Sequence, residues 1–461
     1  MVILVHFLTS LRKSKNIKMK KLFILFTLIS FSLQAQYKIE GTLKPADNYS
    51  WVILYKIEGA KQLFVKSGKI ENGRFSFELP ADAKLGMYRV SYKTEGAGFA
   101  DFLFNKENVR FSFNPNSPEQ SIIFEKSSEN ILYQDYIHVV AMAQYALDSL
   151  QVAYFKNPSI QTEKLYTNQL KNVTSLQTSY LNKSKGKMVE SFIKANNRYN
   201  SPNIVKDSKA YLNSMTSHFF DHIDFGNKTL YNSTFLVDRI TDYVFYMNYS
   251  EDEKTQENLH KKAIKEVLAK TKDPIFKKDI IEFLITQFMN YKRVAFVDYL
   301  METYYNPLPK NIQDQEFKDL VKENTAVEVG RIAPDISWTE NGKNYKLSTL
   351  NEAANYVLIF WSTGCSHCTR EIPLLHSFMK DKKKTKIIAF GMEETANNWT
   401  SYIKTLGGWH HILGLQKWEN ETARAYQIYS TPTYIVLNSE KKIIAKPETL
   451  EELQKIIGYL E

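Results

Sequence analysis

Cysteine usage constrains this chain most, because its 461 residues contain only two cysteines, Cys365 and Cys368. A disulfide between residues so close in sequence closes almost no loop, so the loop-entropy argument gives it little stabilising effect. The run Tyr356 to Trp361 just before the pair has the apolar character of a buried strand, and helical periodicity begins at Cys365. We therefore expect a strand-to-helix junction whose two thiols form and break a disulfide.

The place of Cys365 at the first turn of a helix predicts a reactive thiol. Unpaired backbone N–H groups and the positive end of the helix dipole stabilise a thiolate there, and the thiolate is the nucleophilic form. Cys368 follows on the same face one turn later, where it can attack a mixed disulfide formed at Cys365. We predict that Cys365 attacks the substrate and that Cys368 resolves the mixed disulfide.

A metal site is the alternative interpretation of this motif. Two cysteines at this spacing are half of a common zinc ligand set, but the chain contains no second pair. A Cu(I) ion held by the two thiolates is chemically allowed and stays open as an alternative. Apart from it, we expect neither a metal nor another cofactor.

The length of the chain predicts about three domains at roughly 150 residues each. Residues 36–126 contain short alternating runs with turn signals such as Asn72-Gly73, which predicts an antiparallel β-sandwich. Residues 127–325 have helical periodicity, which predicts an all-α region. Residues 326–461 alternate strands with helices, which predicts a mixed α/β layer and completes a multidomain fold.

The clearest elements can be placed from these periodicities. The expected strands of the β-rich region are Trp51 to Ile57, Gln62 to Lys66, Arg74 to Leu79, Tyr88 to Tyr92 and Val109 to Phe113. The expected helices of the middle region are Ile131 to Phe155, Phe235 to Tyr249, Glu257 to Lys270 and Asp279 to Tyr304. The last region should hold helices at Cys365 to Met379, Asn397 to Leu406 and Leu450 to Leu460.

The middle region also contains aromatic and histidine clusters. We interpret His218-Phe219-Phe220-Asp221-His222 and Tyr304-Tyr305 as core, with a ligand groove as the alternative. His218 and His222 have the spacing of metal ligands on one helix face, but no third ligand is evident. Neither cluster indicates a reaction.

The first 35 residues carry most of the excess positive charge. They hold six Lys and Arg and no Asp or Glu, so without them the chain has 54 basic against 50 acidic residues and the net charge falls from +10 to +4. Met19-Lys20-Lys21, the apolar stretch Leu22 to Leu33 and Gln34-Ala35-Gln36 are typical of a signal peptide. We expect export, to the periplasm, with anchoring by an uncleaved signal as the alternative. Nucleic acid is a poor partner because no basic stripe remains.

Several spaced motifs of the last region resemble the thioredoxin superfamily, specifically the exported TlpA-like and AhpC/TSA-related thiol-disulfide oxidoreductases. They are Gly330-Arg331-Ile332-Ala333-Pro334-Asp335, Leu347-Ser348, the cysteine motif, and Tyr429-Ser430-Thr431-Pro432-Thr433-Tyr434. The resemblance implies a thioredoxin-like fold and a cis peptide between Thr431 and Pro432 facing the cysteines, with an ordinary trans turn as the alternative. Asn72 to Phe77 and Phe220 to Phe225 resemble a Bacteroidota arrangement of β-rich and helical domains before such a domain.

The resemblance also implies roles for single residues. Glu371, three places after Cys368, matches an acidic residue that assists proton transfer in the reductase branch, with a solvated helix carboxylate as the alternative. The buried aspartate of thioredoxins proper is absent, since Ile359 stands at its place, so Glu371 is the acid–base candidate. The expected substrate contacts are Trp361, His367, Thr431 and Pro432.

These residues favour a disulfide reductase that acts on exported proteins. A disulfide oxidase or isomerase and a non-catalytic binding protein of the same fold are the alternatives. A thiol peroxidase is disfavoured because Leu358 stands where the peroxiredoxin pattern requires proline. His367 favours the oxidising direction and Glu371 the reducing one, so we predict an intermediate reduction potential. The expected partners are a protein disulfide substrate and a membrane-embedded electron donor.

Overall fold

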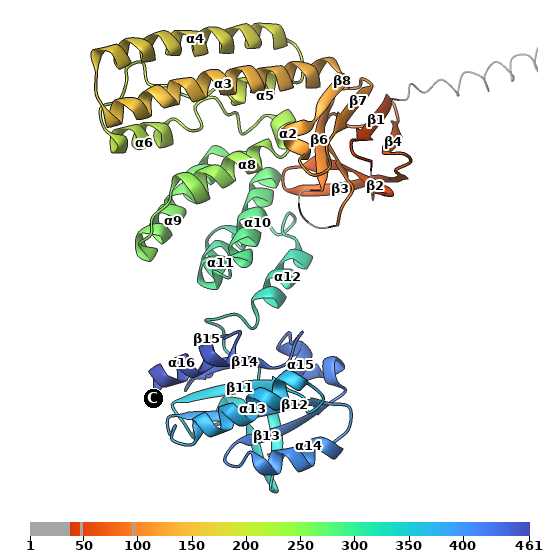
Figure 1. Ribbon diagram of the computed structural model, residues 1–461, viewed down its shortest axis with the longest axis vertical. Coiled ribbons are helices and arrows are strands. Elements are labelled where there is room, and N and C mark those ends of the chain that lie inside the picture. The colour runs from red at the N-terminus through yellow and green to blue at the C-terminus, as the bar shows by residue number, and fades with distance from the viewer. Residues whose placement is uncertain (1–36, 47–48, 95, 97) are drawn as a thin grey trace, which may run out of the picture. The chain divides into compact units, whose positions relative to one another are not determined.

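The computed structural model describes residues 37–461, apart from residues 47–48, 95 and 97 (Figure 1). The chain forms two compact units that divide after Ile280. The signal peptide predicted for residues 1–35 lies outside the described residues. In the part of the chain that is described, no helix combines the length and apolar character needed to cross a bilayer.

The first unit begins with a sandwich of two four-stranded sheets, drawn in red and orange in Figure 1. Alternation of side chains builds its core: in β4 (Arg74–Leu79), Phe75, Phe77 and Leu79 are buried while the polar residues that alternate with them are exposed. One sheet has the order β4-β1-β7-β8 and the other the order β3-β2-β5-β6. The other strands are β1 (Tyr37–Leu43), β2 (Trp51–Glu58), β3 (Lys61–Lys69), β5 (Gly86–Ser91), β6 (Phe99–Phe104), β7 (Val109–Phe113) and β8 (Ile123–Lys126).

One pair of neighbours in the sandwich is parallel. β1 runs parallel to β7, whereas the other strand pairs described in the two sheets are antiparallel. A parallel pair needs a crossover rather than a tight turn. Between β1 and β7 the chain forms the whole second sheet, which serves as this crossover. The expectation of a wholly antiparallel sandwich is therefore wrong for this one pair of strands.

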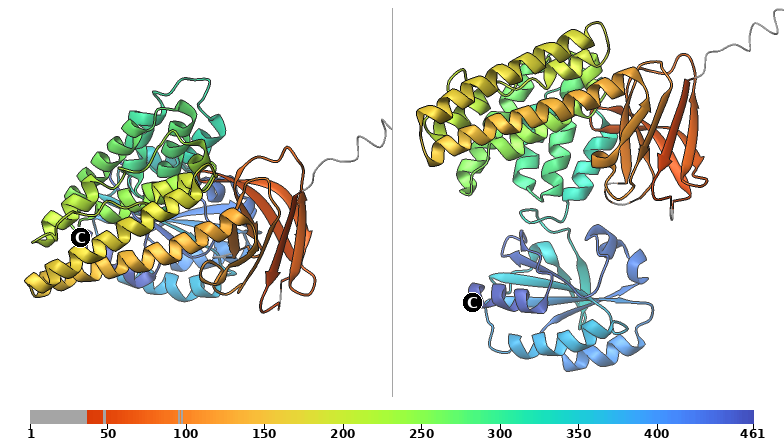
Figure 2. Two further views of the ribbon diagram at one scale, coloured as in Figure 1. Left: turned by 90° about the horizontal axis from the view of Figure 1, so that it is seen from above. Right: turned by 45° about the horizontal axis from the view of Figure 1, so that its top comes forward.

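The helical part of the first unit starts with a long hairpin of α3 (Ser128–Lys156) and α4 (Ile160–Ser184), which lie side by side (Figure 2). α4 was not among the expected helices. Its mean hydropathy is low, and it buries mainly Tyr166, Val173 and Tyr180, a narrow stripe at seven-residue spacing. The following helices are α5 (Glu190–Ala195), α6 (Ser208–Ser217), α7 (Lys228–Tyr231), α8 (Phe235–Thr241) and α9 (Glu253–Lys270).

Two helices expected as single elements are interrupted. The segment 235–249 is α8 followed by a π-helical turn, η1 (Asp242–Met247). The segment 279–304 is divided into α10 (Pro274–Asn290), α11 (Val294–Leu300) and a second π-helical turn, η2 (Met301–Tyr305). The break lies at Lys292, whose φ of 54° is left-handed and ends a right-handed helix. Periodicity alone could not show either interruption, because the apolar pattern continues across it.

α10 crosses the division between the two units, so the helical residues 127–325 are shared between them. The domain boundaries at residues 126 and 325 stay predictions. The second unit continues with α11, η2 and α12 (Gln315–Thr325), and then with the mixed α/β layer.

The α/β layer is a five-stranded sheet with the order β13-β12-β11-β14-β15. β11 (Asn355–Trp361) is parallel to β12 (Thr385–Glu393) and antiparallel to β14 (Thr433–Asn438). All seven residues of β11 are buried, as expected for a central strand covered on both faces. The edge strands are β13 (His410–Leu415) and β15 (Ile443–Ala445).

Each face of this sheet has its own cover. One face packs against α13 (Ser366–Met379), α14 (Asn397–Tyr402) and α16 (Leu450–Leu460). The other face packs against the hairpin of β9 (Ser337–Glu340) and β10 (Lys343–Lys346) and against α15 (Glu421–Ala425). This arrangement places the end of β11 and the start of α13 at one rim of the sheet, where the two cysteines lie.

Candidate active site

The cysteine pair lies at the junction predicted from the sequence. β11 ends at Trp361, a three-residue turn follows, and Cys365 is the N-cap residue of α13. Its Sγ takes the place of a capping oxygen and accepts a hydrogen bond from the backbone N–H of Cys368 at 3.3 Å. The sulfur therefore faces the unpaired N–H groups of the helix start.

Hydrogen bonds to its sulfur set the acidity of Cys365. Burial alone raises the pKa of its thiol, but hydrogen bonds from Cys368, from the side chain of Thr431 and from the backbone of His367 outweigh burial and hold the pKa below its usual value. Cys365 is also partly exposed, so an incoming disulfide can reach it. The thiolate form is thus both favoured and accessible.

Cys368 lies in the opposite environment. Its side chain is fully buried among apolar residues of α13 and β11. Burial, together with the hydrogen bond to Cys365, raises the pKa of the Cys368 thiol to about 12. It therefore stays protonated at neutral pH until a partner removes its proton.

The loop before β14 closes the other side of the pair. The Thr431–Pro432 peptide is cis, which confirms the expectation. The carbonyl oxygen of Thr431 lies 3.3 Å from the Sγ of Cys365, which donates to it as a thiol. Thr431 and Pro432 are both partly exposed beside the sulfur, so a substrate that reaches Cys365 also meets this loop.

Glu371 lies one turn beyond Cys368 in α13 and is half-buried. Its Oε2 accepts a hydrogen bond from the hydroxyl of Tyr434 in β14 at 3.0 Å. Burial raises the pKa of Tyr434, and the charges of Glu371 and of both cysteines raise it further. Glu371 is therefore held in the neighbourhood of the cysteines and is not a freely solvated carboxylate.

The remaining two expected site residues differ from each other. His367 is exposed between the cysteines, as a substrate contact requires. Trp361 is fully buried with 0% of its surface exposed, and its ring packs on Tyr402 with the centroids 5.2 Å apart. The expected contact between Trp361 and a substrate is wrong for this structure, because an all-buried strand puts its side chain under the cysteine pair.

One residue of the site was missed by sequence reasoning. Glu393, the last residue of β12, is buried and accepts three hydrogen bonds from Ser362 and Thr363 in the turn before Cys365. The available signal was a glutamate at the carboxyl end of an apolar strand, where parallel strands bring their ends to one rim. That signal has no fixed spacing to the cysteines, so it could not be matched to them.

The histidine and aromatic clusters of the middle region do not form a comparable site. α6 ends at Ser217, so His218 and His222 do not share a helix face, and the metal-ligand spacing has no helix to support it. His218 instead binds Asp221 at 2.6 Å. Phe220 is buried against Tyr243 and Phe225, as the core interpretation requires, and it also borders a hollow of about 800 Å³.

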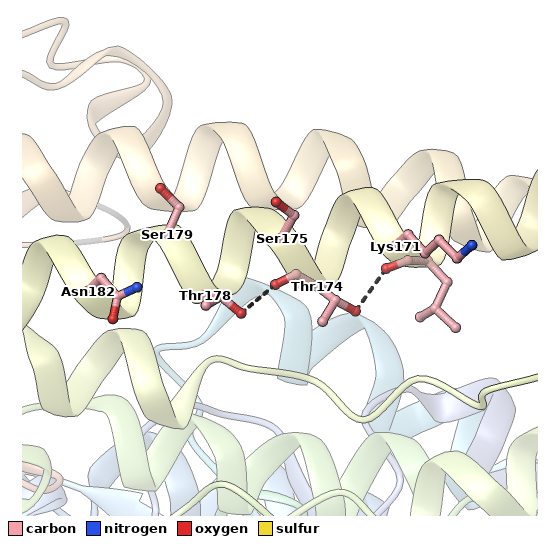
Figure 3. A pocket seen from close by; sticks show the side chains of 7 residues that line it. Lys171, Thr174, Ser175, Thr178, Ser179 and Asn182 are labelled. Atoms are coloured by element: carbon pink, nitrogen blue, oxygen red, sulfur yellow. Dashed lines mark hydrogen bonds between the residues drawn. The ribbon is translucent and has the colours of Figure 1, made fainter.

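Other surface features offer less chemistry. The hollow along α4 in Figure 3 is lined by hydroxyls that bond to their own helix: Thr174 donates to the carbonyl of Leu170 and Thr178 to that of Thr174. Among the residues that the structure describes, no group of three or more His, Cys, Asp or Glu side chains is arranged to hold a metal ion. The cysteine rim is therefore the candidate active site.

Comparison with known proteins places this rim in a family. A family model for thioredoxin-like proteins matches residues 355–443, which contain both cysteines and Pro432. The chain carries a thioredoxin-like domain. A second model, for a domain of unknown function (DUF4369), matches residues 37–154, which hold the sandwich and most of α3. The combination fits an architecture of Bacteroidota proteins.

Several relatives of the thioredoxin-like domain are named thiol-disulfide oxidoreductases. ResA, so named in Geobacillus thermodenitrificans, is 26% identical over 145 residues, which cover 30% of this chain and 82% of the relative. The solved thioredoxin domain of a thiol-disulfide oxidoreductase from Bacteroides vulgatus is 26% identical, covers 29% of this chain and 96% of its own, and has a TM-score of 0.26. A thioredoxin-like protein from Bacteroides caccae is 17% identical, covers 57% of this chain and 98% of its own, and has a TM-score of 0.29.

Proposed function

We propose that this protein is an exported thiol-disulfide oxidoreductase that reduces disulfides of other exported proteins through Cys365 and Cys368. The observation that carries the proposal is the contrast between the two thiols of one helical turn. Cys365 is accessible and more acidic than an ordinary thiol, whereas Cys368 is buried and far less acidic. An attacking and a resolving cysteine need this division of properties.

The reaction has two exchange steps. The Cys365 thiolate attacks one sulfur of the substrate disulfide, and the other substrate sulfur leaves as a thiolate that takes up a proton. Cys368 then loses its proton and attacks the Sγ of Cys365, which releases the second substrate sulfur. Two electrons have passed to the substrate, and the protein holds a Cys365–Cys368 disulfide.

Residues around the pair have supporting roles in this proposal. Glu371, held by Tyr434, receives the proton that Cys368 must lose. Thr431 and Pro432 contact the substrate backbone next to Cys365, and His367 contacts it from the helix start. A membrane-embedded dithiol donor returns two electrons and two protons after each turnover, since the protein carries only one cysteine pair.

A trapping experiment tests the roles of the cysteines. Cys368→Ser should retain substrate proteins on Cys365 as mixed disulfides, because the resolving attack is lost while the first attack remains. Cys365→Ser should retain none. Non-reducing gels and mass spectrometry of full-length protein incubated with disulfide-bonded insulin would show the adducts. Adducts on the Cys365→Ser variant instead would reverse the assignment.

The direction of electron flow is tested by the reduction potential. Since His367 and Glu371 oppose each other, we expect a potential of about −180 to −270 mV, between the values typical of an isomerase and of thioredoxin. His367→Ala should make it more negative, because a group that favours the Cys365 thiolate is lost. Equilibration with glutathione buffers measures both. A wild-type value near the strong-oxidant value of about −120 mV would replace the reductase by an oxidase.

A further inference from the structure

Glu393 makes an unusual set of contacts behind the active site. Its Oε1 accepts a hydrogen bond from the backbone N–H of Thr363 at 2.6 Å. Its Oε2 accepts from the hydroxyl of Thr363 at 3.1 Å and from that of Ser362 at 3.3 Å. All three donors therefore come from two consecutive residues of the turn that joins β11 to Cys365.

The burial of this carboxylate requires those donors. Glu393 is only 6% exposed, and in the part of the chain that the structure describes it forms no ion pair with a lysine or arginine. A buried carboxylate is costly unless hydrogen bonds replace its water. Its neighbour Glu394 is exposed and forms an ion pair with Lys417 at 3.7 Å. The two adjacent glutamates therefore differ in burial: the first side chain is buried and the second is exposed.

Hydrogen bonds within this turn also fix the position of Cys365. The N–H of Cys365 donates to the carbonyl of Ser362 at 3.1 Å, and the N–H of Gly364 donates to the Ser362 hydroxyl at 3.2 Å. Ser362 thus lies between Glu393 on one side and the backbone N–H groups of Gly364 and Cys365 on the other. A shift of this turn would move Cys365 away from the N-cap position.

We propose that Glu393 is the positioning residue of Cys365, holding the turn 362–364 so that the sulfur stays against the N–H groups at the start of α13. This inference rests on the proposed function, in which Cys365 is the attacking thiol. Glu393 itself touches no substrate. It acts from the neighbouring strand, through the turn, on the geometry that favours the thiolate.

Two variants separate position from charge. Glu393→Gln keeps an oxygen for the Thr363 N–H, and its amide can donate to the two hydroxyls, which accept as readily as they donate. The turn is then retained while the negative charge is lost. Glu393→Ala removes both. Glu394→Ala is the control, because it removes an exposed carboxylate one residue away.

The readout is the pH dependence of iodoacetamide alkylation at Cys365, in full-length protein with Cys368→Ser. We expect Glu393→Ala to raise the pH midpoint by about one unit, a roughly tenfold lower rate below the midpoint. Glu393→Gln and Glu394→Ala should stay within about twofold of the parent. A Glu393→Ala profile equal to that of Glu394→Ala overturns the proposal. A downward shift in Glu393→Gln overturns it in favour of a direct charge effect.

A further variant covers the case in which Glu393→Ala does not fold. Thr363→Val removes one of the three hydrogen bonds at nearly constant shape, and we expect a two- to threefold slower alkylation with a parallel upward shift of the midpoint. An unchanged profile would refute the positioning role. Alkylation needs no disulfide substrate, whereas insulin reduction by the parent protein tests the proposed function, so failure of one does not imply failure of the other.

Discussion

Cys365 and Cys368 are one helical turn apart, yet their thiols have opposite surroundings. Cys365 caps α13 and accepts hydrogen bonds from backbone N–H groups, whereas Cys368 is buried in the apolar core between α13 and the sheet. The helix start made the first property predictable from sequence. The depth of Cys368 depends on how β11 and α13 pack, which residue spacing alone does not give.

This contrast predicts different pH behaviour for the two thiols. In single-cysteine variants at pH 7, Cys365 should be alkylated at least about a hundredfold faster than Cys368, since a pKa of about 12 leaves few thiolates and higher intrinsic nucleophilicity compensates only in part. The Cys365 rate should rise with pH with a midpoint below the pKa of a free cysteine, because the pKa of its thiol is lowered. Stopped-flow alkylation between pH 5 and 10 measures both. Equal rates would contradict the assigned environments.

At the scale of elements, the strands and helices of the α/β layer were the most predictable. β11 was predictable because its sequence is continuously apolar, and α16 because it is strongly amphipathic. α13 begins directly after Cys365, as predicted. α4 was missed because its surface is polar on nearly every side. The π-helical turns were missed because they keep the apolar spacing of the helices that they extend.

The contact between β12 and α14 gives a prediction at this scale. A Cβ at Gly391 would lie 2.3 Å from Nε1 of the buried Trp399, so Gly391→Ala must displace that ring. We expect a loss of about 1–3 kcal/mol in the free energy of unfolding, the usual cost of overpacking. Urea unfolding of the full-length variant measures it.

The matched control is Gly458→Ala in α16. A Cβ there meets nothing within 4 Å, so the change should stabilise the helix by about 0.5–1 kcal/mol through the lower backbone entropy of alanine. If both alanine variants changed stability in the same direction, the close contact at Gly391 would not be the cause.

At the scale of the whole molecule, the sequence predicted the order of the regions from changes in periodicity. It did not predict that α10 would cross from one compact unit to the other, because a helix that bridges two units has the same periodicity as one inside a single unit. Arg331, which belongs to the motif before the sheet, binds both carboxylate oxygens of Asp298 at 2.7 Å. The segment that leads into the α/β layer is therefore tied to α11.

This tie predicts how fragments of the chain behave. Fragments 326–461 and 281–461 should both fold and show the same reduction potential, since the cysteine rim lies in both. The longer one should be more stable by about 1 kcal/mol from the half-exposed bidentate pair, beyond the added helices themselves. Asp298→Asn in the longer fragment should remove that increment in urea unfolding. No effect of Asp298→Asn would show that the pair adds nothing measurable.

The parallel pairing of β1 with β7 has a consequence in time. β1 begins at Tyr37 and is an inner strand of its sheet. One of its neighbours is β4, and the other is β7, which starts only at Val109. If the chain folds from its amino end, β1 must keep the edge that pairs with β7 open until the whole second sheet has followed. Pairing over such a distance in sequence is slow. The first strand of the sandwich is thus among the last to be fully paired, and the sandwich stays vulnerable to aggregation during that interval.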